Sequence, residues 1–363
     1  MIKDQIADQG EVARKRSQKL KKSLSETLTR FYPFAGRLSS SSLSIDCNDQ
    51  GVKYVETRVK CRLQDIQPDG DQSLAKLMPP PATTGTESLV RVKVNFFECG
   101  GMAIGITISH KVGDVSTMKL FINTWAAMTQ QGSISDAVPD FTTIPSLFPT
   151  MDFPGKPPQY QEVAFRRLVF DASKIPMLKA QVASKEVAQP SRVEAVVALL
   201  WKCARAAATT NRAQITTSTL EEETELSELQ SLVKQIRDGM RDQFSESCMR
   251  KLQGSDGFSE ITAALTRSGS LMSQGDDFDI YTCTSWCKFQ LYESADFGWG
   301  KPKWVTYFIQ YYLLNLPNTF VLMDSSDGEG IEARVTMDED EMPFFECNQE
   351  LLAFASVNPC VQL

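Results

Sequence analysis

Residues 89–125 carry the pattern that most restricts what this chain can fold into. Two apolar runs, 89–97 and 102–108, are separated by Gly100 and Gly101, a spacing typical of a β-hairpin. From residue 115 onward, apolar side chains recur at about the 3.6-residue period of an α-helix. The segment therefore predicts a hairpin whose second strand leads into a helix, and side chains at such a junction can project into a cleft.

The chain's single histidine, His110, lies at this junction. The imidazole is the side chain whose ordinary pKa lies closest to neutral pH, so acid/base chemistry near pH 7 would fall to His110. Asp114 follows four residues later. By spacing alone, the pair indicates equally well a catalytic motif or a histidine satisfied by backbone, with Asp114 capping the next helix.

The length and the prolines indicate two domains. At 363 residues the chain exceeds the usual size of one domain, about 100–200 residues. Six prolines from Pro139 to Pro158 remove backbone donors and disfavour helix. We therefore expect one domain of residues 1–138, a crossover loop at 139–162 and a second domain of residues 163–363.

Other elements follow from periodicity and from helix-stop and helix-start signals. A helix is expected over 17–30, and Pro33 lies just beyond its end. Ser191 and Glu194 fit a capping box that opens a further helix. The remaining expectations are strands at 43–47, 52–59 and 163–170, helices over 195–208 and within 220–244, and a flexible Gly- and Ser-rich loop over 254–275.

Composition argues against several classes of function. The formal net charge of −7 gives no reason to expect a nucleic-acid partner. One histidine and nine cysteines without a repeated spacing do not make a zinc site, so no metal is expected. Free thiols, no apolar leader and no membrane-length apolar run predict a cytoplasmic protein without a membrane partner.

Three strings have no simple periodic explanation: Phe31–Leu38 (FYPFAGRL), Ser109–Asp114 (SHKVGD) and Asp296–Pro302 (DFGWGKP). In this order and at these separations they resemble the plant BAHD family of acyl-CoA-dependent acyltransferases, with its HxxxD and DFGWG motifs. The similarity covers most of the chain. It is strongest to the vinorine synthase-like branch of alkaloid acetyltransferases.

The resemblance implies an α/β fold of two chloramphenicol acetyltransferase-like domains, each a mixed β-sheet flanked by helices, with an active-site channel at their interface. It implies that His110 takes a proton from an acceptor hydroxyl, which attacks an acyl-CoA thioester directly in a ternary complex. The acceptor would be a plant specialised metabolite such as an alkaloid. Acetyl-CoA is the expected donor, no cofactor is bound permanently, and a monomer is expected.

The resemblance also implies roles for other residues. Asp114 would shape the loop that presents His110, paired with an arginine. Trp299 would either donate its indole N–H to the tetrahedral oxyanion or pack beside its neighbours. Structural roles fall to Asp296, Gly298 and Gly300. Ser191 and Arg192, at a helix start that favours anions, would meet a CoA phosphate or only cap the helix.

Two departures from the family pattern leave three interpretations open. The chain begins close to the helix before Phe31, where family members usually have several tens of earlier residues. Between residues 213 and 220, the Asn-Leu-Arg and Gly-Asn segments are not found, and with them the arginine expected to pair with Asp114. The chain is then an active acyltransferase, a degenerate or mis-spliced relative that at most binds CoA or a small molecule, or a peptide-synthetase condensation domain. The last is disfavoured by Ser109 and Val115, which replace that domain's usual histidine and glycine.

Overall fold

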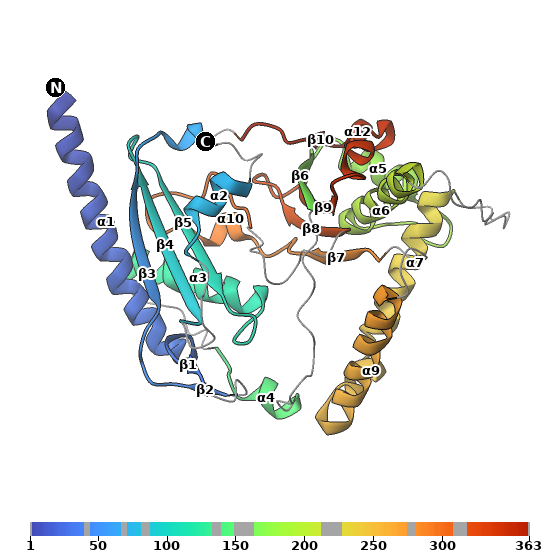
Figure 1. The fold of residues 1–363 in the computed structure, drawn as a ribbon, viewed down its shortest axis with the longest axis horizontal. Coiled ribbons are helices and arrows are strands. Elements are labelled where there is room, and N and C mark those ends of the chain that lie inside the picture. The colour runs from blue at the N-terminus through green and yellow to red at the C-terminus, as the bar shows by residue number, and fades with distance from the viewer. Residues whose placement is uncertain are drawn as a thin grey trace. The chain divides into compact units, whose positions relative to one another are not determined.

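The computed structural model describes residues 2–39, 44–66, 71–80, 88–132, 139–148, 163–211, 227–273, 280–307 and 318–361 (Figure 1). The chain forms two compact units. The first comprises Met1–Phe141, Phe289–Gln310 and Cys360–Leu363, and the second comprises Thr142–Lys288 and Tyr311–Pro359. The expectation of one continuous second domain from residue 163 is therefore corrected for the segment that begins at Phe289. Phe297 and Trp299 of this segment pack in the core of the first unit. Local sequence patterns do not predict such a contact between distant segments.

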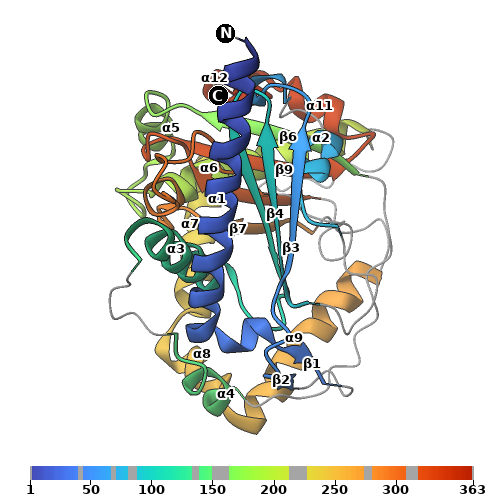
Figure 2. The same ribbon diagram turned by 90° about the vertical axis from the view of Figure 1, so that its left-hand side faces the viewer.

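A three-stranded mixed sheet forms the centre of the first unit. Strand β4 (Val90–Phe97) pairs in parallel with β3 (Lys53–Val59) and antiparallel with β5 (Met102–Ile108). Alternate residues of β4 are fully buried on one face, where α1 (Ile2–Arg30) and α3 (Val115–Gln131) cover the sheet. Figure 2 shows α1 lying across this face. The predicted helix over 17–30 and the predicted hairpin are thus confirmed.

The opposite face of β4 is polar and holds the end of a short helix. Arg91, Lys93 and Asn95 alternate with the buried valines, as the two-residue period of a strand requires. Their side chains donate to the carbonyl oxygens of Pro80, Lys76 and Leu77 at 2.7, 2.6 and 2.8 Å. Helix α2 (Asp71–Leu77) ends here, so these donors satisfy carbonyls that have no partner within the helix.

The Phe31–Leu38 string closes the first unit's core beneath α1. A 3₁₀ turn, η1 (Tyr32–Ala35), follows the helix, and β1 (Arg37–Leu38) then pairs with β2 (Ile45–Asp46). A Cβ on Gly36 would lie 2.5 Å from the carbonyl oxygen of Asp46, so the close approach of the two chains requires glycine. A second 3₁₀ turn, η2 (Leu63–Asp65), follows β3.

The second unit is built on a five-stranded sheet in the order β10-β6-β9-β8-β7. Only β7 and β8 are parallel, and the other pairs are antiparallel. The strands are β6 (Val163–Phe170), β7 (Thr282–Ser285), β8 (Thr319–Asp324), β9 (Ile331–Asp338) and β10 (Ser356–Val357). The apolar helix α6 (Arg192–Asn211) packs in this unit's core, with residues 195–200 almost fully buried.

Shorter helices complete the second unit. They are α4 (Thr143–Leu147), α5 (Ile175–Val182), α7 (Glu228–Gln243), α11 (Met342–Glu346) and α12 (Gln349–Phe354). The short helix α10 (Leu291–Ser294) belongs to the first unit. The expected crossover loop at 139–162 holds α4 in its described part, and residues 149–162 lie outside the described residues. The predicted helix within 220–244 is confirmed from Glu228 onward.

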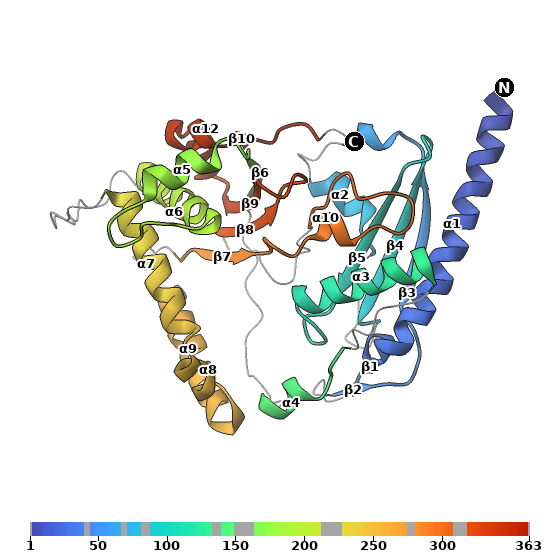
Figure 3. The ribbon, with the colours of Figure 1, turned by 180° about the vertical axis from the view of Figure 1, so that it is seen from behind.

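The expected flexible loop over 254–275 is wrong, because residues Gly254–Ser273 form helix α9. The many glycines and serines of this segment are typical of a loop, but apolar residues recur at 258, 261 and 265, on one face of a helix. In Figure 3, α7, α8 (Glu246–Lys251) and α9 follow one another away from the sheet of their unit. No helix of the described residues has the length and apolar character needed to cross a membrane.

Candidate functional site: the His110 turn

His110 lies in a tight turn at the end of β5. The amide of Ser109 donates to the carbonyl of Leu89 at 2.8 Å, which extends the β4-β5 ladder by one bond. The amide of Val112 then donates to the carbonyl of Ser109 at 3.0 Å, so His110 and Lys111 occupy the two central positions of the turn. Val112 packs against the core of the first unit, and this contact anchors the turn.

The imidazole itself is exposed at the apex of this turn. Among the described residues its side chain takes part in no hydrogen bond or ion pair. Its backbone is therefore fixed, while within the described part of the chain neither ring nitrogen is occupied by a hydrogen bond, which leaves both available for proton transfer.

Asp114 is the N-cap of α3. Its backbone is extended, and its carboxylate Oδ1 accepts from the amide of Thr117 at 2.8 Å and from the hydroxyl of Thr117 at 2.7 Å. Gly113 makes room for this contact, because a Cβ there would lie 2.9 Å from the Cβ of Thr117. The capping alternative for Asp114 is confirmed.

The carboxylate of Asp114 is held in its charged form. Burial alone would raise its pKa, but hydrogen bonds from the amide and hydroxyl of Thr117 and the charge of His110 bring the pKa of Asp114 below its ordinary value. Asp114 forms no ion pair with any described lysine or arginine. Residues 213–220, where the family pattern would place the arginine partner of Asp114, lie outside the described residues.

The DFGWG string forms a second local structure in the first unit. Asp296 accepts from the amides of Gly298 at 2.7 Å and Gly300 at 3.1 Å with one carboxylate oxygen. Both glycines have left-handed backbones, with φ of 92° and 104°. The buried ring of Phe297 packs edge-on against Trp125 of α3, with centroids 4.9 Å apart. These contacts are those of residues that shape and anchor a loop, the role expected for Asp296 and the glycines.

Trp299 lies at the other end of α3 from the His110 turn. A Cβ on the adjacent Gly298 would lie 3.6 Å from the Cα of Gln130, near the C-terminal end of α3. At about 1.5 Å per residue, Gln130 is roughly 24 Å along the helix axis from Asp114. The guanidinium of Arg16 lies over the indole, 5.3 Å from its centroid. An oxyanion donor must come within about 3 Å of the reacting oxygen, so this placement does not support the oxyanion role and agrees with packing.

The predicted capping box at the start of α6 is confirmed. The amide of Ser191 donates to the carboxylate of Glu194 at 2.6 Å, and the amide of Glu194 donates to the hydroxyl of Ser191 at 3.1 Å. Arg237 of α7 adds a bidentate ion pair to Glu194. Burial alone would raise the pKa of Glu194, but Arg237 and Ser191 lower it to about 2. No local sequence pattern indicates Arg237 as the partner of Glu194, because it lies on another helix.

Arg192 is engaged within its own unit. It donates to the carbonyls of Gly328 and Glu329 at 2.7 Å each and pairs with Asp324 at 2.9 Å. A CoA phosphate would have to displace these partners, so the contacts favour a structural role for Arg192 in holding the β8-β9 turn.

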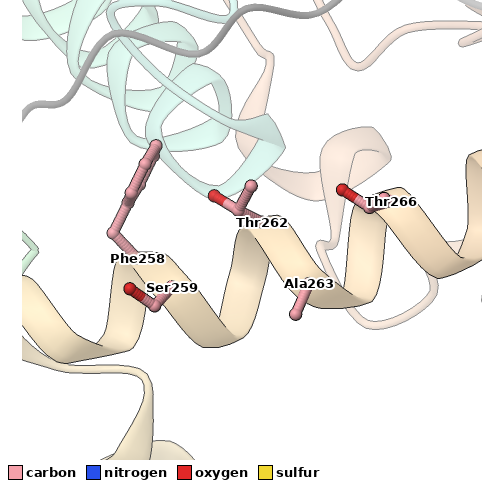
Figure 4. Close-up of a pocket in the computed structure, with 5 residues that line it drawn as sticks. All are labelled: Phe258, Ser259, Thr262, Ala263 and Thr266. Carbon is pink, nitrogen blue, oxygen red and sulfur yellow. The ribbon is translucent and has the colours of Figure 1, made fainter.

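No other described feature offers the chemistry of the His110 turn. A surface hollow of about 500 Å³ lies along α9 in the second unit (Figure 4), and none of its lining residues titrates near neutral pH: Phe258, Ser259, Thr262, Ala263 and Thr266. Among the described residues, no group of three or more His, Cys, Asp or Glu side chains could hold a metal ion.

Comparisons with known proteins agree with the fold. The profile of the Transferase family matches residues 8–222 and 216–352. A 17,18-epoxy-17-hydroxycur-19-ene N-malonyltransferase of Strychnos nux-vomica is 34% identical, covering 94% of this chain and 79% of that protein. Stemmadenine O-acetyltransferase of Catharanthus roseus is 32% identical, covering 90% and 82%. The crystal structure of vinorine synthase superposes with a TM-score of 0.75 at 30% identity, covering 94% and 86%.

These matches and the two mixed sheets flanked by helices define an acyltransferase of α/β fold. The chain belongs to the BAHD family of acyltransferases. Its similarity to vinorine synthase and to alkaloid acyltransferases is consistent with the branch expected from the sequence motifs. The family resemblance and the fold class are thus confirmed.

Proposed function

We propose that this protein transfers an acyl group from acyl-CoA to the hydroxyl of a small plant metabolite, with His110 as the general base. The observation that carries the proposal is the His110 turn: the chain's only imidazole is exposed, unpaired among the described residues and fixed through Ser109, Val112 and the α3 cap. Membership of an acyl-CoA-dependent family supplies the donor class.

The reaction follows from what an imidazole can do at this position. A ring nitrogen of His110 accepts the proton of the acceptor hydroxyl as its oxygen attacks the thioester carbonyl. The tetrahedral intermediate then expels the CoA thiolate, which takes the proton from the imidazolium. Because the transfer is direct, in a ternary complex, no acylated serine or cysteine is required. Asp114 and Thr117 act on this step only by holding the turn.

The proposed donor is acetyl-CoA and the proposed acceptor is an alkaloid hydroxyl. An O-acetyltransferase among the relatives supports both assignments. An N-malonyltransferase at similar identity makes malonyl transfer and an amine acceptor the alternatives that a substrate panel must include. Free thiols at all nine cysteines support a reducing, cytoplasmic setting. We propose a monomer, the state that the family resemblance implies.

A second candidate is a family member with little activity that binds CoA or a small molecule. The observation that favours it is the hydrogen bonding of Asp114, which accepts only from Thr117 in the described part of the chain. A carboxylate without its expected cation would hold the histidine turn less firmly.

The test measures release of free CoA thiol from acetyl-CoA and malonyl-CoA with a panel of alkaloid alcohols and amines. His110→Ala should lose about 10²–10⁴ in kcat, the usual contribution of a general base. Lys111→Ala, on the neighbouring exposed position of the same turn, is the matched control and should stay within a few-fold of wild type. A folded His110→Ala variant with undiminished rate would overturn the mechanism. Equal inactivity of all three proteins, together with measurable CoA binding by calorimetry, would favour the binder.

A further inference from the structure

Two cysteines of the first unit lie on neighbouring segments, Cys61 just beyond the end of β3 and Cys99 in the tip of the β4-β5 hairpin. Val59 of β3 and Phe97 of β4 form the last paired positions of the parallel ladder. Cys61 follows two residues after the first, and Cys99 two residues after the second. Neither sulfur is deeply buried, because Cys99 is exposed and Cys61 is half-buried.

Two hydrogen bonds hold the segments together. The amide of Glu98 donates to the carbonyl of Cys61 at 3.3 Å, and the amide of Leu63 donates to the sulfur of Cys99 at 3.3 Å. The sulfur of Cys99 therefore lies over the backbone two residues beyond Cys61. Cys61 lies in a bend and Cys99 in a turn, so neither is held in a strand ladder, and both segments can adjust to the Cα spacing of about 4.4–6.8 Å that a disulfide requires.

We propose that Cys61 and Cys99 are a reversible redox site, which oxidised glutathione converts to a disulfide that staples the hairpin tip to the end of β3. In the first step the thiolate of Cys99 attacks glutathione disulfide and expels one glutathione thiolate. The thiolate of Cys61 then attacks the sulfur of Cys99 and expels the second. Two cysteine thiols are oxidised, one glutathione disulfide is reduced to two thiols, and the two protons end on glutathione.

The surroundings favour this order of attack. Burial together with the carboxylates of Asp65 and Glu98 raises the pKa of the Cys61 thiol, which lowers the fraction of Cys61 present as the attacking thiolate. The more exposed Cys99 meets a bulky disulfide first, and Cys61 acts as the resolving thiol.

A Cys61–Cys99 disulfide would fix the position of the hairpin tip, which other residues of the first unit contact. Arg16 of α1 donates to the carbonyl of Gly100, next to Cys99, at 3.3 Å. The same guanidinium lies over the indole of Trp299. Closing the loop between residues 61 and 99 also removes conformations from the unfolded chain, which stabilises the folded unit.

The experiment treats the purified full chain with glutathione buffers of increasing oxidised fraction and analyses non-reduced peptides by mass spectrometry. We expect one cross-linked peptide joining Cys61 to Cys99, and an unfolding midpoint higher by about 5 °C or more. Cys61→Ser should stop at a glutathione adduct on Cys99, without the rise in midpoint. Cys47→Ser, which removes another exposed cysteine of the same unit, should still form the cross-link.

Separate glutathione adducts on Cys61 and Cys99 in the wild type, or a cross-link from either to another cysteine, would overturn the proposal. A cross-link that forms only after denaturant is added would do the same, because the site would then not exist in the folded protein. Dithiothreitol should restore the original midpoint. None of these measurements depends on acyl transfer, so the result stands apart from the proposed function.

Discussion

Removing the carboxylate of Asp114 tests whether this residue acts through structure or through its charge. In Asp114→Ala the amide and hydroxyl of Thr117 both lose their acceptor at the start of α3. Loss of an N-cap costs about 1 kcal/mol, within a range of roughly 0.5–2. Because Asp114 is exposed, water can replace part of the loss, so we expect the lower half of that range.

Asp114→Asn separates the two roles. Asparagine caps helices as well as aspartate does and keeps the hydrogen bond to the Thr117 amide, but it carries no charge toward His110. If Asp114 is structural, the Asn variant should stay within about 0.5 kcal/mol of wild type in unfolding free energy and keep most of its kcat. The Ala variant should lose both stability and kcat.

The assay combines chemical unfolding with initial rates of CoA thiol release for wild type, Asp114→Ala and Asp114→Asn. Equal losses of kcat in both variants, with the stability of Asp114→Asn intact, would refute the reasoning, because the negative charge itself would then act on the reaction. A salt titration of the rates provides a check, since a role through charge would weaken as ionic strength rises.

Three other substitutions test the packing described above. Gly113→Ala should push Thr117 away and disturb the His110 turn, which would appear as a fall in kcat exceeding the change in KM; unchanged kinetics would contradict the close approach. Glu194→Gln should cost about 3 kcal/mol of unfolding free energy at pH 7, because the pKa of Glu194 falls from 4.5 to about 2 on folding. That difference is present above pH 4.5 and should vanish as the pH falls toward 2, and a constant difference would argue against the ion pair. Phe297→Ala should cost about 3 kcal/mol, and an unchanged unfolding midpoint would show that its core contact is unimportant.

Local sequence patterns predict the structure correctly where a segment's own residues determine its conformation. The β4-β5 hairpin, the start of α3 at its Asp114 cap and the Ser191 capping box all follow from residues within a few positions of one another. The helix α9 contradicts the loop expected from its serines and glycines, because its apolar residues recur at helical spacing. Propensity is a weak signal when it disagrees with periodicity.

Contacts between distant segments explain the other differences. No sequence pattern near residue 289 indicates that the following segment belongs to the first unit, because Phe297 contacts Trp125 only in the folded chain. For the same reason, the sequence could not choose between the two roles of Trp299 or find Arg237 as the partner of Glu194. The position of His110 was predictable because strand, turn and helix are adjacent in sequence.

The return of the segment that begins at Phe289 has a consequence for how the protein is made. The first unit's core is closed by Phe297, which leaves the ribosome about 170 residues after Trp125. At the usual 5–20 residues per second, the earlier part of this unit waits on the order of 10–30 s with an incomplete core. During that interval its apolar surface is available to chaperones, and an N-terminal fragment expressed alone is expected to aggregate. Nascent-chain length, rather than the order of the units in the sequence, then decides when the core of the first unit is complete.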